Sequence, residues 1–448
     1  MSYLDFFVIS VKDFRLNFVA LTKSTNKLIM NIIKNIMIGA TLMLSLPVVA
    51  QKFVGGDISL LPSYEQKGAK YYDASGNAIP AFLLFLAQQG WNAQRVRLFV
   101  DPSKAPAEKR AEGAVQDLDY VTALGKRIKD TGHKFMLDLH YSDTWTDPGQ
   151  HAVPVDWTSA SPAELVDKVY SYTKSTLQHL VAAGATPDFI QPGNEITYGM
   201  LWPTGRCYPT GANYGSGTFE NFARYLKAAI RACREVCPEA KIVVHTEMSF
   251  ADNVPAFYNT LKSYTDDYDI IGLSYYPDYH GSLSTLNSVL TRLETNHPSK
   301  KIMIVETGYG SQWQLPGSKK NFTSVWPLTE QGQAKFASDL IALLNNHASV
   351  TGLFWWMPED NEAGVDWHNP VRSTWWNGSL FNQSTGRVLG AMQILRTFLG
   401  GSNEVPHRFT DKSELEKWFT PSGQAIVQPV RSGIYITQGR KIFIPSAR

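Results

Sequence analysis

Short apolar segments alternate with stretches of helical periodicity between residues 53 and 358, and this alternation constrains the fold more than any other feature of the chain. The segments are rich in Val, Ile, Leu and Phe, which is typical of parallel strands covered on both faces. They span residues 53–59, 94–100, 134–141, 189–195, 241–247, 269–277, 301–307 and 352–358. Strands of this number alternating with helices predict an α/β fold, a (β/α)8 TIM barrel.

The stretches between these segments carry helix start and stop signals. One of them begins with Ser161 as the N-cap and has Glu164 three residues later, which is the pattern of a capping box. Apolar residues then recur at helical spacing up to Gly184. Residues 221–238 and 329–347 show the same kind of pattern. Helices are therefore predicted between the strands, as a barrel requires.

The N-terminal segment has the shape of a secretory signal. From Met30, a lysine (Lys34) precedes an apolar stretch that ends at Ala50, where cleavage is expected. A transmembrane anchor is the alternative, but the apolar run is short and contains a proline. Residues 1–29 are then an upstream extension. We expect an exported protein that is periplasmic, attached to the cell surface or secreted.

The chain is accordingly divided into three parts. Residues 1–50 form the N-terminal extension and signal peptide, and residues 51–400 form the (β/α)8 catalytic domain. Residues 401–448 have a different composition, with short β-like runs such as "GIYITQGRKIFI" separated by turn signals. They are predicted to be a short C-terminal β tail.

The composition of the chain indicates which classes of binding partner are favoured. The net charge of +2 without a long basic run disfavours nucleic-acid binding. The chain has 12 Trp, 20 Tyr and 22 Phe, and such rings suit both core packing and stacking against sugars. Its cysteines, Cys207, Cys233 and Cys237, lack the spacing of a metal site, so we interpret them as structural or free thiols.

Polar residues gather at the C-terminal ends of the predicted strands, which is where barrel active sites form. They are Asp57, Arg97, His140, Asn194, Glu195, His245, Glu247, Tyr275 and Glu306. A buried carboxylate is costly unless it is used, and two of them end the fourth and seventh strands. Because these strands lie across the barrel mouth, Glu195 and Glu306 are predicted to converge.

A pair of facing carboxylates suits cleavage of a glycosidic bond. One carboxyl group protonates the leaving oxygen, and in retaining enzymes the other, ~5–5.5 Å away, is the nucleophile. One group must be protonated and the other ionised, so their surroundings must differ. We expect Arg97 to keep Glu306 charged and Tyr275 to donate a hydrogen bond to it. Asn194 is placed to hold a sugar 2-hydroxyl.

Several motifs resemble glycoside hydrolase family 53, the endo-β-1,4-galactanases of clan A. They are "GGDISLLPSYEQKGAKYYD", "RVRLFVDP", "LDLHYSDTWTDPGQH", "IQPGNEITYGMLWPTG", "IGLSYYPDYHG", "IVETGYG" and "FWWMPE", in order over residues 55–359. The resemblance implies a retaining endo-β-1,4-galactanase acting on β-1,4-galactan (type I arabinogalactan), with Glu195 as acid/base and Glu306 as nucleophile. It implies sugar contacts from Asp57, Arg97, His140, Asp143, Trp145, Asn194, Tyr275 and Trp356.

One departure concerns calcium. Some bacterial members of this family carry a calcium loop after the seventh strand, rich in Asp, His and Asn. Here that loop, residues 308–322, contains no Asp, although oxygen-rich ligand sets are what calcium needs. Residues 358–369 ("PEDNEAGVDWHN") could supply acidic ligands instead. No cofactor is expected to be required, and a structural calcium ion stays open.

The roles of several tryptophans are also open. Of the two neighbours in "FWW", Trp356 is expected to face the barrel mouth and the other the helices. Trp375 and Trp376 are either packing residues or a platform for sugar, and Trp313 is similar.

Two alternative functions are also compatible with the sequence. One is another clan A endo-glycanase, on xylan or mannan. The other is a catalytically silent sugar-binding barrel, whose mark would be the loss of one glutamate. The expected partner is the polysaccharide substrate, and a monomer is expected.

Overall fold

The computed structural model describes residues 51–373 and 378–400 in full, together with the backbone of four short strands between Trp418 and Ile444. The predicted signal segment, residues 1–50, lies outside the described residues, as do Trp375 and Trp376.

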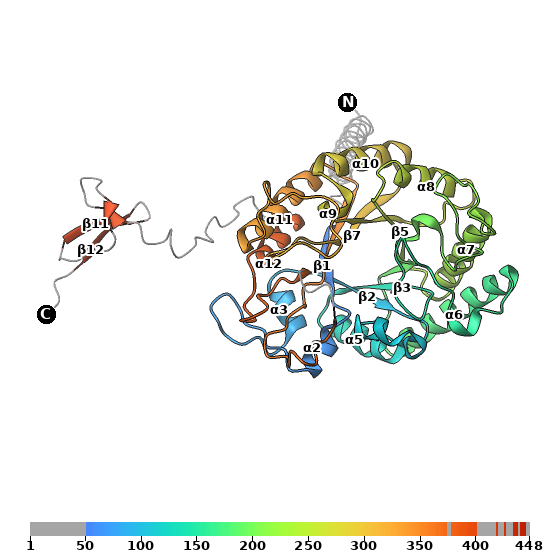
Figure 1. Ribbon diagram of the computed structural model, residues 1–448, viewed down its shortest axis with the longest axis horizontal. Helices are drawn as coiled ribbons and strands as arrows, with labels where there is room; N and C mark the ends of the chain where they lie inside the picture. Colours follow the sequence, from blue (N-terminus) through green and yellow to red (C-terminus); the bar gives the residue numbers. More distant parts are fainter. Residues whose placement is uncertain are drawn as a thin grey trace, which may run out of the picture. The chain divides into compact units, whose positions relative to one another are not determined.

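The described part of the chain contains a closed barrel of parallel strands in sequential order, with β1 paired to β8. The strands are β1 (Phe53–Asp57), β2 (Ala93–Leu98), β3 (Lys134–Leu139), β4 (Phe189–Pro192), β5 (Lys241–Glu247), β6 (Ile270–Tyr275), β7 (Lys301–Thr307) and β8 (Val350–Trp356). Helices surround the strands in a ring (Figure 1). The predicted (β/α)8 TIM barrel is confirmed.

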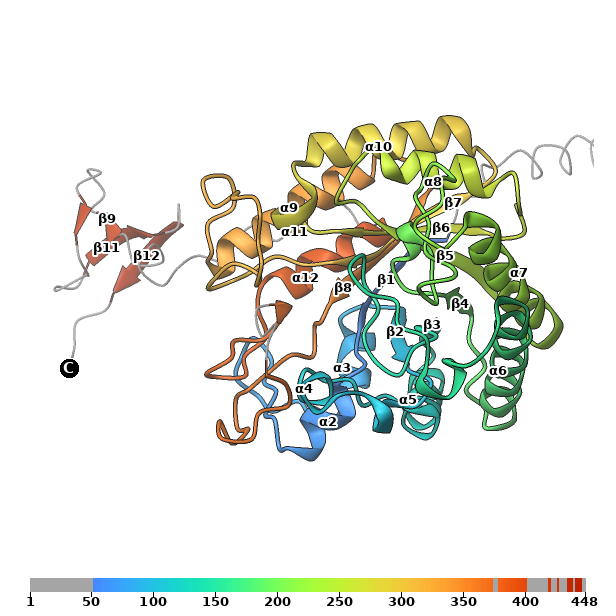
Figure 2. The ribbon, with the colours of Figure 1, turned by 45° about the vertical axis from the view of Figure 1, so that its right-hand side comes forward.

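The larger helices between the strands are α5 (Leu118–Asp130), α6 (Pro162–Ala182), α7 (Phe219–Val236), α8 (Asn253–Leu261), α10 (Leu283–Asn296) and α11 (Glu330–Leu344). Shorter helices are α2 (Leu61–Gln66), α3 (Phe82–Gln88), α4 (Ala107–Ala111), α9 (Pro277–His280) and α12 (Ala391–Leu395). The turned view of Figure 2 shows α6 and α7 together on the outside of the barrel. The predicted capping box of α6 is present, with Ser161 and Glu164 bonded reciprocally.

The barrel interior is built in layers. Its lower layer is apolar and includes Ala93, Met136, Phe189 and Val243. Two residues further along the same strands, and therefore on the same inward face, stand Arg95, Asp138, Gln191 and His245. The interior thus changes from apolar to polar toward the C-terminal ends of the strands, and this change prepares the barrel mouth for a functional site.

Close packing between the first two strands depends on a glycine. A Cβ atom built on Gly55 would lie 2.1 Å from the carbonyl oxygen of Ala93, a distance that no side chain can occupy.

A second apolar core fills the space between the strands and the surrounding helices, and it contains the fully buried Trp355.

The C-terminal tail contains a small antiparallel sheet with strand order β10-β9-β11-β12. The strands are β9 (Trp418–Phe419), β10 (Ala425–Ile426), β11 (Gly433–Thr437) and β12 (Arg440–Ile444). Strands β11 and β12 pair in antiparallel orientation, and both lie within the β-like run "GIYITQGRKIFI" of the predicted tail. Among the described residues, none of the helices combines the length and the apolar character that a membrane crossing demands.

Candidate active site

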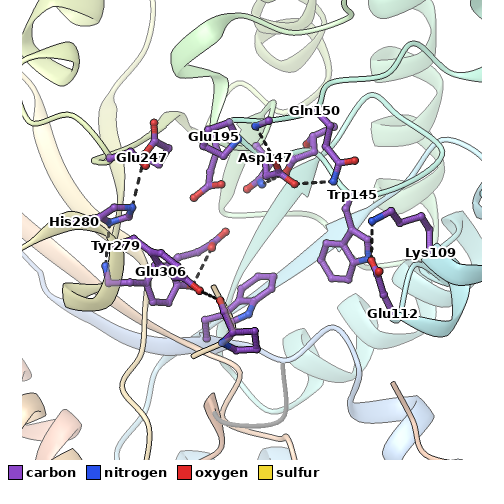
Figure 3. A pocket seen from close by; sticks show the side chains of 18 of the residues that line it. Lys109, Glu112, Trp145, Asp147, Gln150, Glu195, Glu247, Tyr279, His280 and Glu306 are labelled. Carbon is purple, nitrogen blue, oxygen red and sulfur yellow. Dashed lines mark hydrogen bonds and ion pairs between the residues drawn. The ribbon is translucent and has the colours of Figure 1, made fainter. Parts of the chain in front are cut away.

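A cavity of about 580 Å³ opens at the C-terminal ends of the strands. Side chains from the ends of β4, β5, β6, β7 and β8 line it, together with the loops after β2 and β3. Its volume is in the range of small-ligand sites. In Figure 3, Glu195 and Glu306 reach into this cavity from opposite walls. The predicted convergence of the two glutamates is therefore observed.

The backbone at the end of β4 is shaped to present Glu195. Gly193 has φ of 96°, and a Cβ atom there would approach the Cγ2 atom of Ile196 to 2.6 Å. Glu195 itself is left-handed, with φ of 48° and ψ of 47°. Such a conformation is uncommon for a residue with a side chain, and it costs of order 1 kcal/mol. The backbone N–H of Glu195 donates to Nδ1 of His245 at 3.2 Å, which helps to hold the turn.

Both oxygens of Glu306 have defined partners. Its Oε1 atom lies 2.9 Å from Nη2 of Arg95. Its Oε2 atom accepts a hydrogen bond from the hydroxyl of Tyr276 at 3.1 Å. Both interactions favour the ionised carboxylate and fix its orientation.

Arg95 is fully buried and is the centre of a polar network. Its guanidinium contacts Asp57 at 3.0 Å and Asp138 at 2.8 Å, besides Glu306. It also donates to the side-chain oxygen of Asn194 at 2.9 Å. Since a buried guanidinium is costly to desolvate, this network is better understood as a rigid support than as a source of stability.

The two glutamates differ in their electrostatic surroundings. Burial raises the pKa of Glu195 well above its usual range, and the negative charges of Glu306 and Glu247 raise it further. Burial also raises the pKa of Glu306, but Arg95 opposes that effect. When one proton is shared between the two groups, it therefore resides on Glu195, and Glu306 carries the charge.

Two contacts expected from the sequence are wrong. Arg97 pairs with Asp57 at 2.9 Å rather than with Glu306, because Arg95 is the arginine that reaches β7. The hydroxyl of Tyr275 donates to the carbonyl of Gly281 at 2.9 Å. Tyr275 points away from the cavity toward the helices, where its ring stacks on Phe336.

Three further predicted sugar contacts do not line the cavity. Asp57 is buried between Arg95 and Arg97. His140 accepts from the backbone N–H of Thr146 through Nδ1, so its Nε2 faces Asp138 at 3.1 Å. Asp143 accepts backbone N–H bonds from Asp101 and Val155, which fastens two loops together. Direct sugar contact by these residues stays a prediction.

Other predicted residues do line the cavity, namely Trp145, Asn194 and Trp356. The rings of Trp145 and Trp356 meet edge to face at 6.1 Å between centroids. The guanidinium of Arg97 lies 4.3 Å from the ring centroid of Trp145 and 5.4 Å from that of Trp356. Arg97 therefore lies against both rings, and its direct contact with a sugar stays a prediction. The expectation that Trp356 faces the mouth is confirmed.

The remaining aromatic predictions have different outcomes. Trp375 and Trp376 are not among the described residues, so their proposed stacking stays a prediction. Trp313 is 48% exposed and does not line the cavity.

Glu247 lines the cavity and its Oε2 lies 3.7 Å from Nε2 of His280, whereas His245 donates toward Ser274. The sequence predicts His245 and Glu247 to be a hydrogen-bonded pair at the barrel mouth, and this prediction is wrong, because each bonds to a different residue.

Three residues of the polar network around Glu306 were not predicted from the sequence, namely Arg95, Asp138 and Tyr276. Each has a signal in the sequence. Arg95 lies two residues before Arg97 on the same strand face, and Asp138 lies two residues before His140. Tyr276 is the second tyrosine of "SYYP".

The described residues do not fit a calcium site. They contain no group of three or more His, Cys, Asp and Glu side chains that could hold a metal ion. In the loop after β8, Asp360 pairs with Arg372, and one oxygen of Glu359 accepts from the backbone N–H of Leu60. A structural calcium ion stays a prediction, and the function proposed below does not depend on one.

Comparison with known proteins places this geometry in a family. The arabinogalactan endo-beta-1,4-galactanase of Thermothelomyces thermophilus is 31% identical over 362 residues, which is 78% of this chain and 99% of that protein. The solved GH53 catalytic domain of Ignisphaera aggregans has a TM-score of 0.66 at 31% identity, covering 79% of this chain and 97% of that one. A structure from a study of two fungal beta-1,4-galactanases has a TM-score of 0.65 at 30% identity, covering 78% and 99%.

The family described as Glycosyl hydrolase family 53 matches residues 53–395, which comprise the whole barrel. The chain belongs to this family and is a glycoside hydrolase.

Proposed function

We propose that the protein is a retaining endo-β-1,4-galactanase that hydrolyses the β-1,4-galactan of type I arabinogalactan. The observation that carries the proposal is the pair of glutamates in one cavity, of which only Glu306 is held by a guanidinium. This asymmetry supplies an ionised nucleophile and a protonated acid.

In the first step, a carboxylate oxygen of Glu306 attacks the anomeric carbon while Glu195 gives its proton to the glycosidic oxygen. The leaving chain departs as an alcohol, and a glycosyl ester forms on Glu306. As the negative charge of Glu306 is consumed, the pKa of Glu195 falls. Glu195 is then a carboxylate and can act as a base.

In the second step, Glu195 takes a proton from a water molecule, and the oxygen of that water attacks the anomeric carbon. The ester bond breaks, Glu306 regains its charge, and the sugar is released with its configuration retained. Asn194 lines the cavity next to this centre, and its side-chain oxygen is occupied by Arg95. One amide hydrogen of Asn194 donates to the carbonyl of Thr146 at 2.7 Å, and the other is available to a sugar 2-hydroxyl.

The substrate is proposed from two relatives at 31% identity, which are named arabinogalactan endo-β-1,4-galactanases. A xylanase or mannanase remains the neighbouring alternative. A silent sugar-binding barrel is disfavoured, because both glutamates are present and converge.

A reducing-sugar assay on a panel of galactan, xylan, mannan and arabinan tests the proposal. We expect release from galactan alone. Release from xylan or mannan but not from galactan would mean that the protein is a xylanase or a mannanase. Binding to galactan without any release would favour the silent sugar-binding barrel.

We also propose that the protein is exported and works as a monomer without a required cofactor. The support for export is the signal-like segment that ends at Ala50.

A further inference from the structure

A second hollow, of about 680 Å³, adjoins the catalytic cavity. The two share Ser249 and His280 in their linings, so a bound chain can pass from one to the other. The loops after β4, β5 and β6 form most of the hollow, with Lys320 from the loop after β7. The mechanism above gives no role to this part of the molecule.

Two exposed aromatic rings border the hollow. Phe250 is 65% exposed and Tyr208 is 43% exposed. The ring of Tyr208 packs against the ring of Tyr214, with 5.1 Å between their centroids. The guanidinium of Arg206 in turn lies over the ring of Tyr214. Large rings exposed around a hollow commonly mark a binding surface, and their faces suit the C–H face of a hexose.

The polar groups of the hollow favour a neutral ligand with many hydroxyls. The hydroxyl of Tyr198 and the amide of Asn253 are bonded to each other at 2.9 Å and can also reach a ligand. The charged lining residues are Asp252 and Lys320, and their charges cancel. Asp252 also pairs with Arg292, and Lys320 donates to the carbonyl of Tyr279. Burial lowers the pKa of His280 to about 3, so this side chain adds no charge.

The hollow lies on the side of the acid. Tyr198 and Tyr208 belong to the same loop as Glu195, which is the group that protonates the leaving oxygen. We propose that this hollow is an outer subsite for neutral hexose units of the substrate, on the leaving-group side of the cut. The proposal rests on the function proposed above, since it assigns the leaving part of the same chain to the hollow.

Replacing Phe250 with alanine tests the subsite. With galacto-oligosaccharides that extend beyond the cavity on the reducing side, we expect Phe250→Ala to lower kcat/KM about tenfold. With an aryl β-galactobioside, whose leaving group is too short to reach the hollow, we expect kcat/KM to be unchanged. With oligosaccharides labelled at the reducing end, cleavage should move toward the label, because fewer units are held on that side.

Two controls keep the result interpretable. Phe250→Tyr retains a ring and should keep the wild-type pattern. Leu84→Ala removes an exposed apolar side chain on α3, away from both hollows, and should change neither readout. Equal losses on the long and aryl substrates, or an unchanged labelled pattern, would overturn the subsite. Failure of the wild type to cleave galactan would instead overturn the proposed function, before any variant is compared.

Discussion

At the scale of single residues, the site depends on which of two equivalent side chains reaches a glutamate. Arg95 and Arg97 point to the same side of β2, yet only Arg95 contacts Glu306. Tyr275 and Tyr276 are neighbours, yet only Tyr276 donates to Glu306. The roles of the glutamates and of these partners can be separated by substitution.

Removing each glutamate should have a different consequence. Glu306→Ala should lower turnover of every substrate by at least about 10³-fold, because no glycosyl ester can form. Glu195→Ala should lower activity on galactan by about 10²–10⁴-fold. The first step on an aryl glycoside with a good leaving group needs no acid, and azide can attack the glycosyl ester in the second step without a base. Azide should therefore rescue Glu195→Ala on this substrate better than it rescues Glu306→Ala. Identical behaviour of the two variants in this kinetic comparison would contradict the assigned roles.

Tyr276→Phe should move the acid limb of the pH–rate profile. The hydroxyl of Tyr276 stabilises the charged form of Glu306 and so lowers its pKa. Its removal should therefore raise that pKa and shift the acid limb of kcat/KM toward higher pH. The loss of a hydrogen bond to a charged group should also lower kcat/KM by about tenfold or more.

Tyr275→Phe is the matched control for that measurement. It removes the same atom from the neighbouring residue, where the hydroxyl bonds only to the Gly281 carbonyl among the contacts of the described residues. We expect a loss of about 1 kcal/mol in the free energy of unfolding and an unchanged pH profile. A shifted profile in Tyr275→Phe, or none in Tyr276→Phe, would contradict the geometry.

At the scale of elements, the helix starts are where local sequence matters most. Ser161→Ala removes the N-cap of α6 and one half of its capping box. We expect the free energy of unfolding to fall by about 1 kcal/mol, and the Tm by about 2 °C, with kcat unchanged. Ser288→Ala makes the same change at an exposed position inside α10 and should cost nothing, because alanine favours helix interiors. Equal Tm losses in calorimetry would show that capping is not the cause.

The order and type of the elements could be predicted because each strand and helix has its own local signal. The bounds of β5 and β7 agree with the predicted segments, whereas β4 ends at Pro192, three residues before Glu195. The predicted segment included the turn at Gly193, because the apolar pattern alone does not mark the residue at which a strand stops pairing with its neighbours.

The site could be predicted only in part. Glu195 and Glu306 stand out because a carboxylate at a strand end is rare and costly. The partner arginine could not be chosen, since Arg95 and Arg97 share one strand face and only the register between strands decides which one reaches Glu306. A register shift between β6 and β7 at Leu273 and Ser274 places Ser274 opposite Glu306, and the apolar pattern of the sequence does not mark such a shift.

At the scale of the whole molecule, the residues proposed to catalyse the reaction lie in the described barrel, and the N-terminal segment is predicted to direct export. If residues 1–50 direct export, the exported protein should begin at Gln51. Intact-mass measurement of the protein recovered outside the cytoplasm of its producing cell tests this. An exported protein that retains Met30, or one cut within the barrel sequence, would contradict a cleavable signal ending at Ala50.

The central claim is that Glu306 and Glu195 cleave β-1,4-galactan by double displacement. Proton NMR of the first products that the wild-type protein releases from galactan tests it most directly, because each displacement inverts the anomeric carbon. Two inversions restore the original configuration, so the account predicts that the β anomer appears first and the α anomer only later, by mutarotation. Initial formation of the α anomer would mean a single displacement by water, and would contradict the role of Glu306 as nucleophile.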